Sequence, residues 1–203
     1  YHCLSSGINA EYMGGSGEGE MASRCFLCLI TITVFLGAVS GDTNSEDVCV
    51  YTLYVKTGSV LKAGTDAKIS LTLGDAEGLS VWTADLEAWG LMDPSHDYFE
   101  RAGLDAFSGR GPCIGMPLCR LNLTSDGAGK HHGWFCDYVE VTSTGPHRPC
   151  SQSLFYVGRW LATDSPPYEL TAIIDGCDRV EAGAERGGSR RYVVGDPLRA
   201  ASQ

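Results

Sequence analysis

The sequence predicts an all-β protein, an antiparallel eight-stranded β-sandwich, and three observations point to it. Apolar and polar residues alternate with a period of two along several segments of the 203-residue chain, as in strands with one buried face. Turn-forming Gly, Pro and Asp residues lie between these segments. No repeated helical segment separates them, and parallel strands would need such crossovers, so antiparallel pairing is favoured.

The strands follow one another along the chain in a regular way. The first is expected at residues 48–56, where Tyr51, Leu53 and Val55 alternate with Thr52, Tyr54 and Lys56. The same alternation predicts strands at 69–73, 121–123, 135–141 and 168–174, with shorter candidates at 79–83, 104–107 and 154–161. Two long connections, 85–97 and 109–117, interrupt this pattern, and loops of such length are often functional.

Composition narrows the class of protein. Hydrophobic residues make up 43% of the chain and charged residues 20%, which is ordinary globular usage and argues against wholesale disorder or a coiled coil. The formal net charge is −10. Because nucleic-acid binders need a basic face to displace counterions, no nucleic-acid partner is expected.

The chain ends are expected to lie outside the folded domain. Residues 21–40 follow the grammar of a secretory signal peptide, with Arg24 before 15 apolar or small residues and a small-x-small pair at Ala38 and Ser40. A membrane anchor is the alternative, but 15 residues fall short of the ~20 that span a bilayer. We interpret 1–20 as a translated leader, 47–177 as one domain and 178–203 as a disordered tail.

A secretory route gives the cysteines and one sequon a meaning, with the endoplasmic reticulum or the extracellular space (apoplast) as the destination. An even number of cysteines in an oxidising compartment predicts up to three disulfides, with 15 connectivities left open. Asn122-Leu123-Thr124 is an N-glycosylation sequon, which is usable only on this route. The cysteines expected in the mature domain are Cys49, Cys113, Cys119, Cys136, Cys150 and Cys177.

Several motifs in a fixed order carry a family resemblance. They are the tract TGSVLKAGTDAKISLTLGD at 57–75, LNLTSDG at 121–127, HHGW at 131–134 and a WLA corner at 160–162. In this the chain resembles the plant single-domain PLAT (lipoxygenase-homology) proteins, a stress-associated group. The resemblance covers about 47–177 and implies an eight-stranded sandwich without a catalytic domain. It further implies that Cys49 pairs with Cys177, because the first and last strands are neighbours in such a sandwich. Cys136 stands where the family pattern has an aliphatic residue, so Cys136 is expected to be a buried free thiol, which packs like a small hydrophobic side chain.

The resemblance also suggests a calcium site and a membrane contact. Loops at one end of the sandwich bind Ca²⁺ in larger family members, and Gly64, Asp66 and Asp126 are the candidate ligands here. The alternative is that the two aspartates cap turns. Trp89, Leu91 and Met92 are candidates for a tip that makes peripheral membrane or partner contact, the alternative being that they cover the edge of the sandwich.

No catalytic motif is present: the chain has no G-x-S-x-G, no H-E-x-x-H and no phosphate-binding loop. His131 and His132 are adjacent, so on an extended segment they point to opposite faces. The preferred function is therefore a secreted, non-catalytic module that binds a protein or lipid surface. No cofactor is firmly expected, and Ca²⁺ is the one candidate. By resemblance it acts in abiotic stress tolerance and growth regulation. The alternatives are a small secreted hydrolase, or a structural cell-wall or storage scaffold.

Overall fold

The computed structural model describes residues 47–178 and 191–195. The expected leader and signal peptide, and most of the expected tail, lie outside the described residues. Within this part of the chain there is no helix long and apolar enough to cross a membrane.

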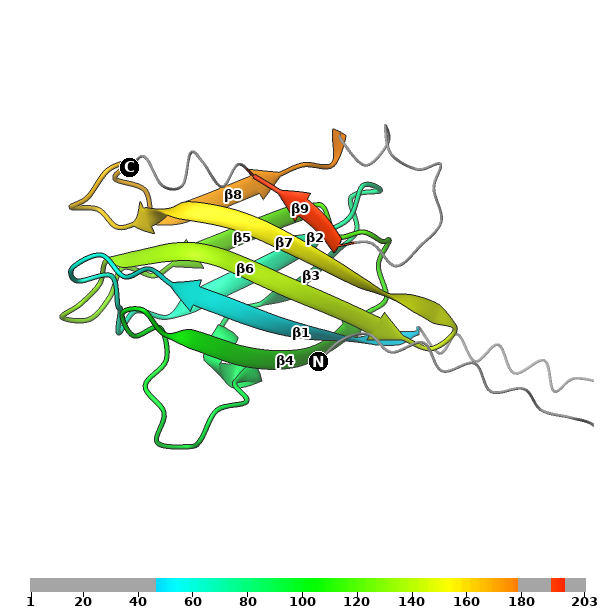
Figure 1. Ribbon diagram of the computed structural model, residues 1–203, viewed down its shortest axis with the longest axis horizontal. Coiled ribbons are helices and arrows are strands. Elements are labelled where there is room, and N and C mark those ends of the chain that lie inside the picture. Colours follow the sequence, from blue (N-terminus) through cyan, green and yellow to red (C-terminus); the bar gives the residue numbers. More distant parts are fainter. Residues whose placement is uncertain (1–46, 179–190, 196–203) are drawn as a thin grey trace, which may run out of the picture. The chain divides into compact units, whose positions relative to one another are not determined.

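The described residues form a β-sandwich of two facing sheets, which Figure 1 shows with β7, β6, β1 and β4 in front and β8, β5, β2 and β3 behind. The five-stranded sheet has the order β4-β1-β6-β7-β9, and the four-stranded sheet has the order β3-β2-β5-β8. The expected β-sandwich is confirmed, with nine strands in the described residues rather than eight. Their bounds are β1 Val48–Thr57, β2 Ile69–Gly74, β3 Ser80–Thr83, β4 Leu104–Pro112, β5 Arg120–Ser125, β6 Trp134–Gly145, β7 Arg148–Leu161, β8 Thr171–Asp175 and β9 Arg191–Val194, with a short 3₁₀ helix η1 at Leu86–Trp89.

The core lies between the two sheets, where inward residues from each alternate with outward ones. On β1 the alternation runs without a break, and Tyr51, Leu53 and Val55 are fully buried. β1 pairs with β4 on one side and β6 on the other, both antiparallel. The period-two pattern of the sequence therefore reflects one face packed against the opposite sheet.

The ninth strand lies where the sequence predicts a disordered tail. That prediction is wrong for Arg191–Val194, which pairs in parallel with β7. Val194 is 2% exposed, and the Tyr192 hydroxyl donates to the Gly176 carbonyl at 2.9 Å. Pairing with the edge of β7 and burial of Val194 give this short strand a fixed place despite its charged surroundings.

The pairing of Cys49 with Cys177 that the family resemblance implies is wrong. Cys49 bonds to Cys113, and Cys119 bonds to Cys177. The reason is topological, because β1 and β8 belong to different sheets and are not neighbours. Cys49 instead lies opposite Gly111 on β4, close to the place where the chain reaches Cys113.

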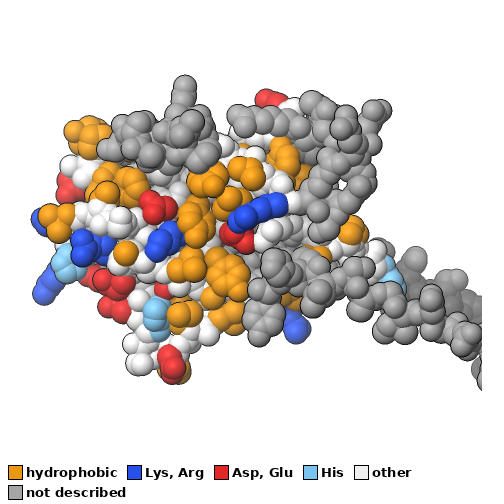
Figure 2. All heavy atoms as spheres, in the orientation of Figure 1, with side chains coloured by type: hydrophobic (Ala, Val, Ile, Leu, Met, Phe, Trp, Pro, Cys, Tyr) orange, Lys and Arg blue, Asp and Glu red, His pale blue; other side chains and the backbone are white. Residues whose placement is uncertain are grey.

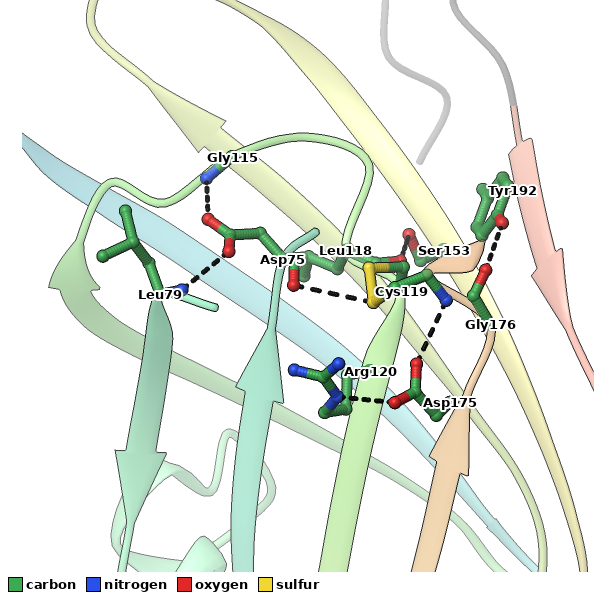
Figure 3. Close-up of a disulfide and its surroundings, with 11 residues drawn as sticks. Asp75, Leu79, Gly115, Leu118, Cys119, Arg120, Ser153, Asp175, Gly176 and Tyr192 are labelled. Carbon is green, nitrogen blue, oxygen red and sulfur yellow. Dashed lines mark hydrogen bonds and ion pairs between the residues drawn. A yellow bond between two sulfur atoms is a disulfide. The ribbon is translucent and has the colours of Figure 1, made fainter. Parts of the chain in front are cut away.

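Both of these disulfides lie at one end of the sandwich, which we call the disulfide end: residues 74–80, 112–119, 145–148 and 176–178. Figure 3 shows its centre, where the Cys119–Cys177 bond lies beside Asp75. Asp75 is fully buried, and its carboxylate accepts from the backbone N–H groups of Leu79 at 2.7 Å and Gly115 at 2.6 Å. A charged acceptor thus ties two separate loops together.

The opposite end we call the loop end: residues 58–68, 99–103, 126–133 and 162–170. Backbone hydrogen bonds join these loops, such as Ala102 N–H to the Gly58 carbonyl at 2.9 Å and Asp66 N–H to the His131 carbonyl at 3.1 Å. In Figure 1 the loop end is on the left, at the arrowheads of β1 and β7.

Candidate functional site

The loop end rests on a floor of buried aromatic rings. Phe99 stacks on Phe107 with centroids 5.6 Å apart and meets Trp134 edge to face at 5.2 Å. The Trp134 indole N–H donates to the Thr57 hydroxyl at 3.0 Å. Buried Asp105 accepts from the Phe99 N–H at 2.8 Å, which fixes the start of the 99–103 loop. The loops above this floor are therefore positioned by packing and by hydrogen bonds.

Above the floor is an open depression. Its lining includes residues from each of the four segments of the loop end, but none from the 126–129 turn. Three cationic side chains, Lys62, Arg101 and Lys130, lie on its lining, with Glu100 and Asp164 as the acidic members. All three cations are exposed, and none makes an ion pair within 47–178 and 191–195. In Figure 2, Lys, Arg and His side chains gather with acidic ones on the left of the view, where the loop end lies.

Exposed apolar side chains lie in two of the loops that line this depression. Leu61 is 77% exposed, Tyr168 63% and Val60 43%. Lys62 and Tyr168 both have a positive φ, 64° and 65°, a conformation that non-glycine residues rarely adopt. Sequence reasoning missed this apolar set. The run Ser59-Val60-Leu61-Lys62, apolar residues next to a cation after a strand-ending Thr-Gly, is the signal that points to it.

The calcium candidate Asp126 lies in the turn after β5 and contacts backbone. Its Oδ1 accepts from the N–H of Ala128 at 2.9 Å and from the N–H of Lys68 at 3.1 Å. This is the turn-capping geometry that competes with the ligand interpretation.

Asp66 and Gly64 do not complete a calcium site with it. The Asp66 carboxylate lies 3.2 Å from His131 Nδ1, and Gly64 lines the depression that holds the three cations. Calcium needs six to eight oxygen ligands, mostly carboxylates and carbonyls. The described residues contain no group of three or more His, Cys, Asp or Glu side chains arranged to hold a metal ion. Two carboxylates that already have partners, with one backbone carbonyl, fall short of the oxygen ligands that Ca²⁺ needs.

The three candidates for a membrane tip take different positions. Trp89 packs over Gly109 of β4, where its indole leaves no room for any side chain. Gly90 then bridges to Phe107, so this segment covers the edge of the five-stranded sheet. Leu91 and Met92 follow with 57% and 37% of their surface exposed. Leu91 and Met92 are therefore exposed, whereas Trp89 is half-buried.

The histidine rings contact carboxylates. A nucleophilic enzyme of the hydrolase type would place a Ser or Cys beside a His. Among the described residues no hydrogen bond joins a His ring to a Ser or Cys side chain. The ring contacts are His96 Nε2 to Asp105 at 2.6 Å, His131 Nδ1 to Asp66 at 3.2 Å and His132 Nε2 to Asp164 at 3.8 Å.

The remaining site cysteines lie on two strands. Cys136 is a fully buried free thiol on β6, and burial raises its pKa well above the usual range. Cys150 is half-buried near the start of β7, and it is not free. Asn122 is half-exposed in the middle of β5.

Comparison with known proteins identifies the family of the chain. The sequence model of the family "Embryo-specific protein 3, (ATS3)" matches residues 37–164. The chain is 51% identical to PLAT domain-containing protein 1 of Arabidopsis thaliana over 73% of this chain and 84% of the relative. It is 57% identical to PLAT domain-containing protein 3 of the same plant over 50% of this chain and 100% of the relative.

Among solved structures, a coral 8R-lipoxygenase is similar with a TM-score of 0.49 and 24% identity, over 62% of this chain and 16% of that one. The chain thus spans about a sixth of that lipoxygenase. The extent and identity of the match to the Arabidopsis relatives decide the assignment: the chain belongs to the family of plant single-domain PLAT, or lipoxygenase-homology, proteins.

Proposed function

We propose that the chain is a secreted, non-catalytic PLAT module that docks on anionic membrane lipid through its loop end. The observation that carries this proposal is the combination of exposed apolar tips, Leu61 and Tyr168, with cations of the loop-end depression that form no ion pair within the described residues. Lipid headgroup regions accept this combination, because apolar side chains enter the acyl boundary while cations meet phosphate. Disulfides support the secretory part, since they persist in oxidising compartments.

Docking on anionic lipid depends on the local charges of the docking surface rather than on the charge of the whole chain. The whole chain carries a net charge of −10, so a uniform surface would be repelled by anionic lipid. Each Lys or Arg near such a surface contributes about 1 kcal/mol of attraction. Lys62, Arg101 and Lys130 together contribute roughly 3 kcal/mol of attraction, which Glu100 and Asp164 on the same lining oppose in part.

The loop end is also preorganised for contact. Lys62, Ala102 and Tyr168 have φ values of 64°, 61° and 65°. Left-handed non-glycine residues cost roughly 1 kcal/mol each, and they are often found where a surface binds something. Because the loops already hold this conformation, little ordering cost remains to be met on docking.

The proposed docking does not require calcium. Asp66 lies beside His131, Asp126 accepts from backbone N–H groups, and Gly64 lines the depression that holds the three cations. Docking is accordingly direct, from side-chain cation to lipid phosphate. The role in abiotic stress tolerance and growth regulation that the family resemblance implies is the physiological part of the proposal, with the apoplast or the endoplasmic reticulum as its place.

Co-sedimentation with vesicles tests the proposal. The protein is mixed with phosphatidylcholine vesicles, with and without phosphatidylserine, in Ca²⁺ or in EDTA. We expect binding only when phosphatidylserine is present, equal in Ca²⁺ and EDTA, and weaker as salt screens the charges. The triple variant Lys62→Gln, Arg101→Gln, Lys130→Gln should lose roughly a hundredfold in partitioning.

The matched control is Arg110→Gln, an exposed cation on β4 near the disulfide end, which should bind like the parent protein. Binding that needs Ca²⁺ would reject the direct contact. Equal binding of the triple variant and the parent would reject the loop end as the docking surface.

A further inference from the structure

The outer face of the four-stranded sheet carries an exposed apolar pair that the docking proposal does not use. Trp82 on β3 is 63% exposed and Ile173 on β8 is 57% exposed. They belong to one cross-strand row, because Trp82 lies opposite Thr72, Thr72 opposite Asn122, and Asn122 opposite Ile173. Side chains at directly opposed positions of a sheet point to the same face. Asn122 therefore lies between an exposed aromatic ring and an exposed aliphatic side chain.

Asn122 is also the acceptor residue of the sequon Asn122-Leu123-Thr124. The Thr124 hydroxyl donates to Asn122 Oδ1 at 3.2 Å, and it lies 3.0 Å from the Thr171 hydroxyl. The Asn122 side-chain nitrogen donates no hydrogen bond within the part of the chain that the structure describes. The atom that would carry a glycan is thus the one that the fold leaves unused, on the solvent side of the strand.

We propose that Asn122 carries an N-linked glycan and that the inner N-acetylglucosamine units of this glycan cover the outer face of the four-stranded sheet between Trp82 and Ile173. The occupant of this face is therefore a sugar that the chain itself carries, rather than a protein partner.

The attachment step is a glycosyl transfer in the secretory pathway. The Asn122 amide nitrogen forms a bond to C1 of the reducing-end N-acetylglucosamine of a polyprenyl-diphosphate-linked oligosaccharide. The bond from C1 to the diphosphate oxygen breaks, the polyprenyl diphosphate leaves with the electron pair, and the amide proton passes to a base of the transferase. The acceptor is the nascent chain, so the position of the sequon within a strand is no obstacle.

The chemistry of the face suits a sugar. Neighbouring strands lie about 4.8 Å apart, so Ile173 is one strand from Asn122 and Trp82 is two strands, or about 10 Å, away. Two linked pyranose rings cover that span. An indole face packs against the C–H faces of a pyranose, and the hydroxyls of Thr72, Thr124 and Thr171 offer hydrogen bonds to its rim.

A glycan here also excludes protein docking on this sheet. Exposed apolar side chains in a row that runs to both edge strands would otherwise invite association between sheets. An oligosaccharide in the middle of the row prevents close approach of another chain. The loop end, which has no sequon, stays accessible.

The test expresses the full chain in plant cells that make only high-mannose glycans. Part of the product is treated with peptide-N-glycosidase, which removes the whole glycan, and part with an endoglycosidase that leaves one N-acetylglucosamine. Mass spectrometry shows whether Asn122 is modified. Acrylamide quenching of tryptophan fluorescence then shows whether the glycan shields Trp82, with Trp82→Phe as the background.

We expect the untreated protein to lose the mass of one glycan with the first enzyme. Its fluorescence should be quenched less than that of the deglycosylated protein and of Asn122→Gln, and this difference should vanish in the Trp82→Phe background. Thr124→Ser, which keeps the sequon, should behave like the parent, and Thr124→Ala like Asn122→Gln.

Two results overturn the inference. An unchanged mass after peptide-N-glycosidase would show that Asn122 is not modified. A glycan that is present but leaves the quenching of Trp82 unchanged would show that it extends into solvent rather than over the sheet.

Discussion

The two ends of the sandwich are built differently. The disulfide end is held by Cys49–Cys113 and Cys119–Cys177, and its central carboxylate, Asp75, is fully buried. The loop end has no disulfide among the described residues, and it exposes Leu61 and Tyr168 beside three cations. β1 spans the distance between them with 10 residues, or roughly 30 Å. The covalent stabilisation and the proposed surface recognition thus lie at opposite ends of the same strands.

Backbone strain follows the same division. Of the five described non-glycine residues with positive φ, four lie at the loop end and only His147 at the disulfide end. Strained backbone lasts only where its surroundings hold it in place. At the loop end this support comes from the aromatic floor and from the buried Asp105 contact with the Phe99 N–H. The comparison predicts that changes at the disulfide end alter stability and changes at the loop end alter binding.

The largest effect on stability is expected from removal of a disulfide at the disulfide end, and Cys119–Cys177 joins residues 58 apart in sequence. Changing both cysteines to Ala should lower the free energy of unfolding by about 2 to 4 kcal/mol, because the unfolded chain regains the freedom of a long loop. Urea denaturation measures this. The folded fraction should still bind phosphatidylserine vesicles, and loss of that binding would show that the two ends are coupled.

A matched pair of aspartates gives the next effect. Asp75→Ala leaves the N–H groups of Leu79 and Gly115 without their acceptor, and it should cost about 2 kcal/mol. Asp126→Ala also removes an acceptor of two N–H groups, but in an exposed turn where water replaces it, so about 0.5 to 1 kcal/mol is expected. Equal losses in the midpoints of thermal unfolding would contradict the contrast between the ends.

The smallest effect is a pH dependence at the disulfide end. The backbone N–H of Cys177 and then the Arg120 side chain lower the pKa of Asp175 below its ordinary value of 3.8. A carboxyl with a lowered pKa in the folded state stabilises the protein above pH 3.8, and this contribution is lost as the pH falls through the lower, folded value. Asp175→Asn should therefore be slightly less stable at neutral pH and approach the stability of the parent as the pH falls through the lowered value. Its partner is an exposed side chain, so the difference is small.

The sequence predicts the architecture well where burial alternates strictly. Residues 48–56 were expected as a strand, and β1 is Val48–Thr57. The disulfide pairing implied by the family resemblance is wrong, because it assumed that the first and last strands are neighbours, whereas β1 and β8 lie in different sheets. β9 was missed because its four residues lie among charged ones, and its burial depends on the edge of β7.

The site was predictable only in part. Asp66 and Asp126 do come from adjacent loops, as the motifs implied, but the sequence could not show that a His ring and backbone N–H groups occupy their oxygens. Lys62, Arg101 and Lys130 lie far apart in the chain, and only the antiparallel order of β1, β4 and β6 brings their loops to one end. Patches assembled from separate loops leave no local pattern.

The most direct test of the central claim places a solvatochromic fluorophore at either end. Leu61→Cys labels the loop end, and Ala76→Cys, in the exposed turn between β2 and β3, labels the disulfide end. Buried Cys136, with its raised pKa, does not compete for the label. On phosphatidylserine vesicles the label at 61 should shift to the blue and be quenched by lipids that carry a quencher in the acyl region, while the label at 76 stays unchanged. A shift at 76 without one at 61 would contradict the assignment of recognition to the loop end.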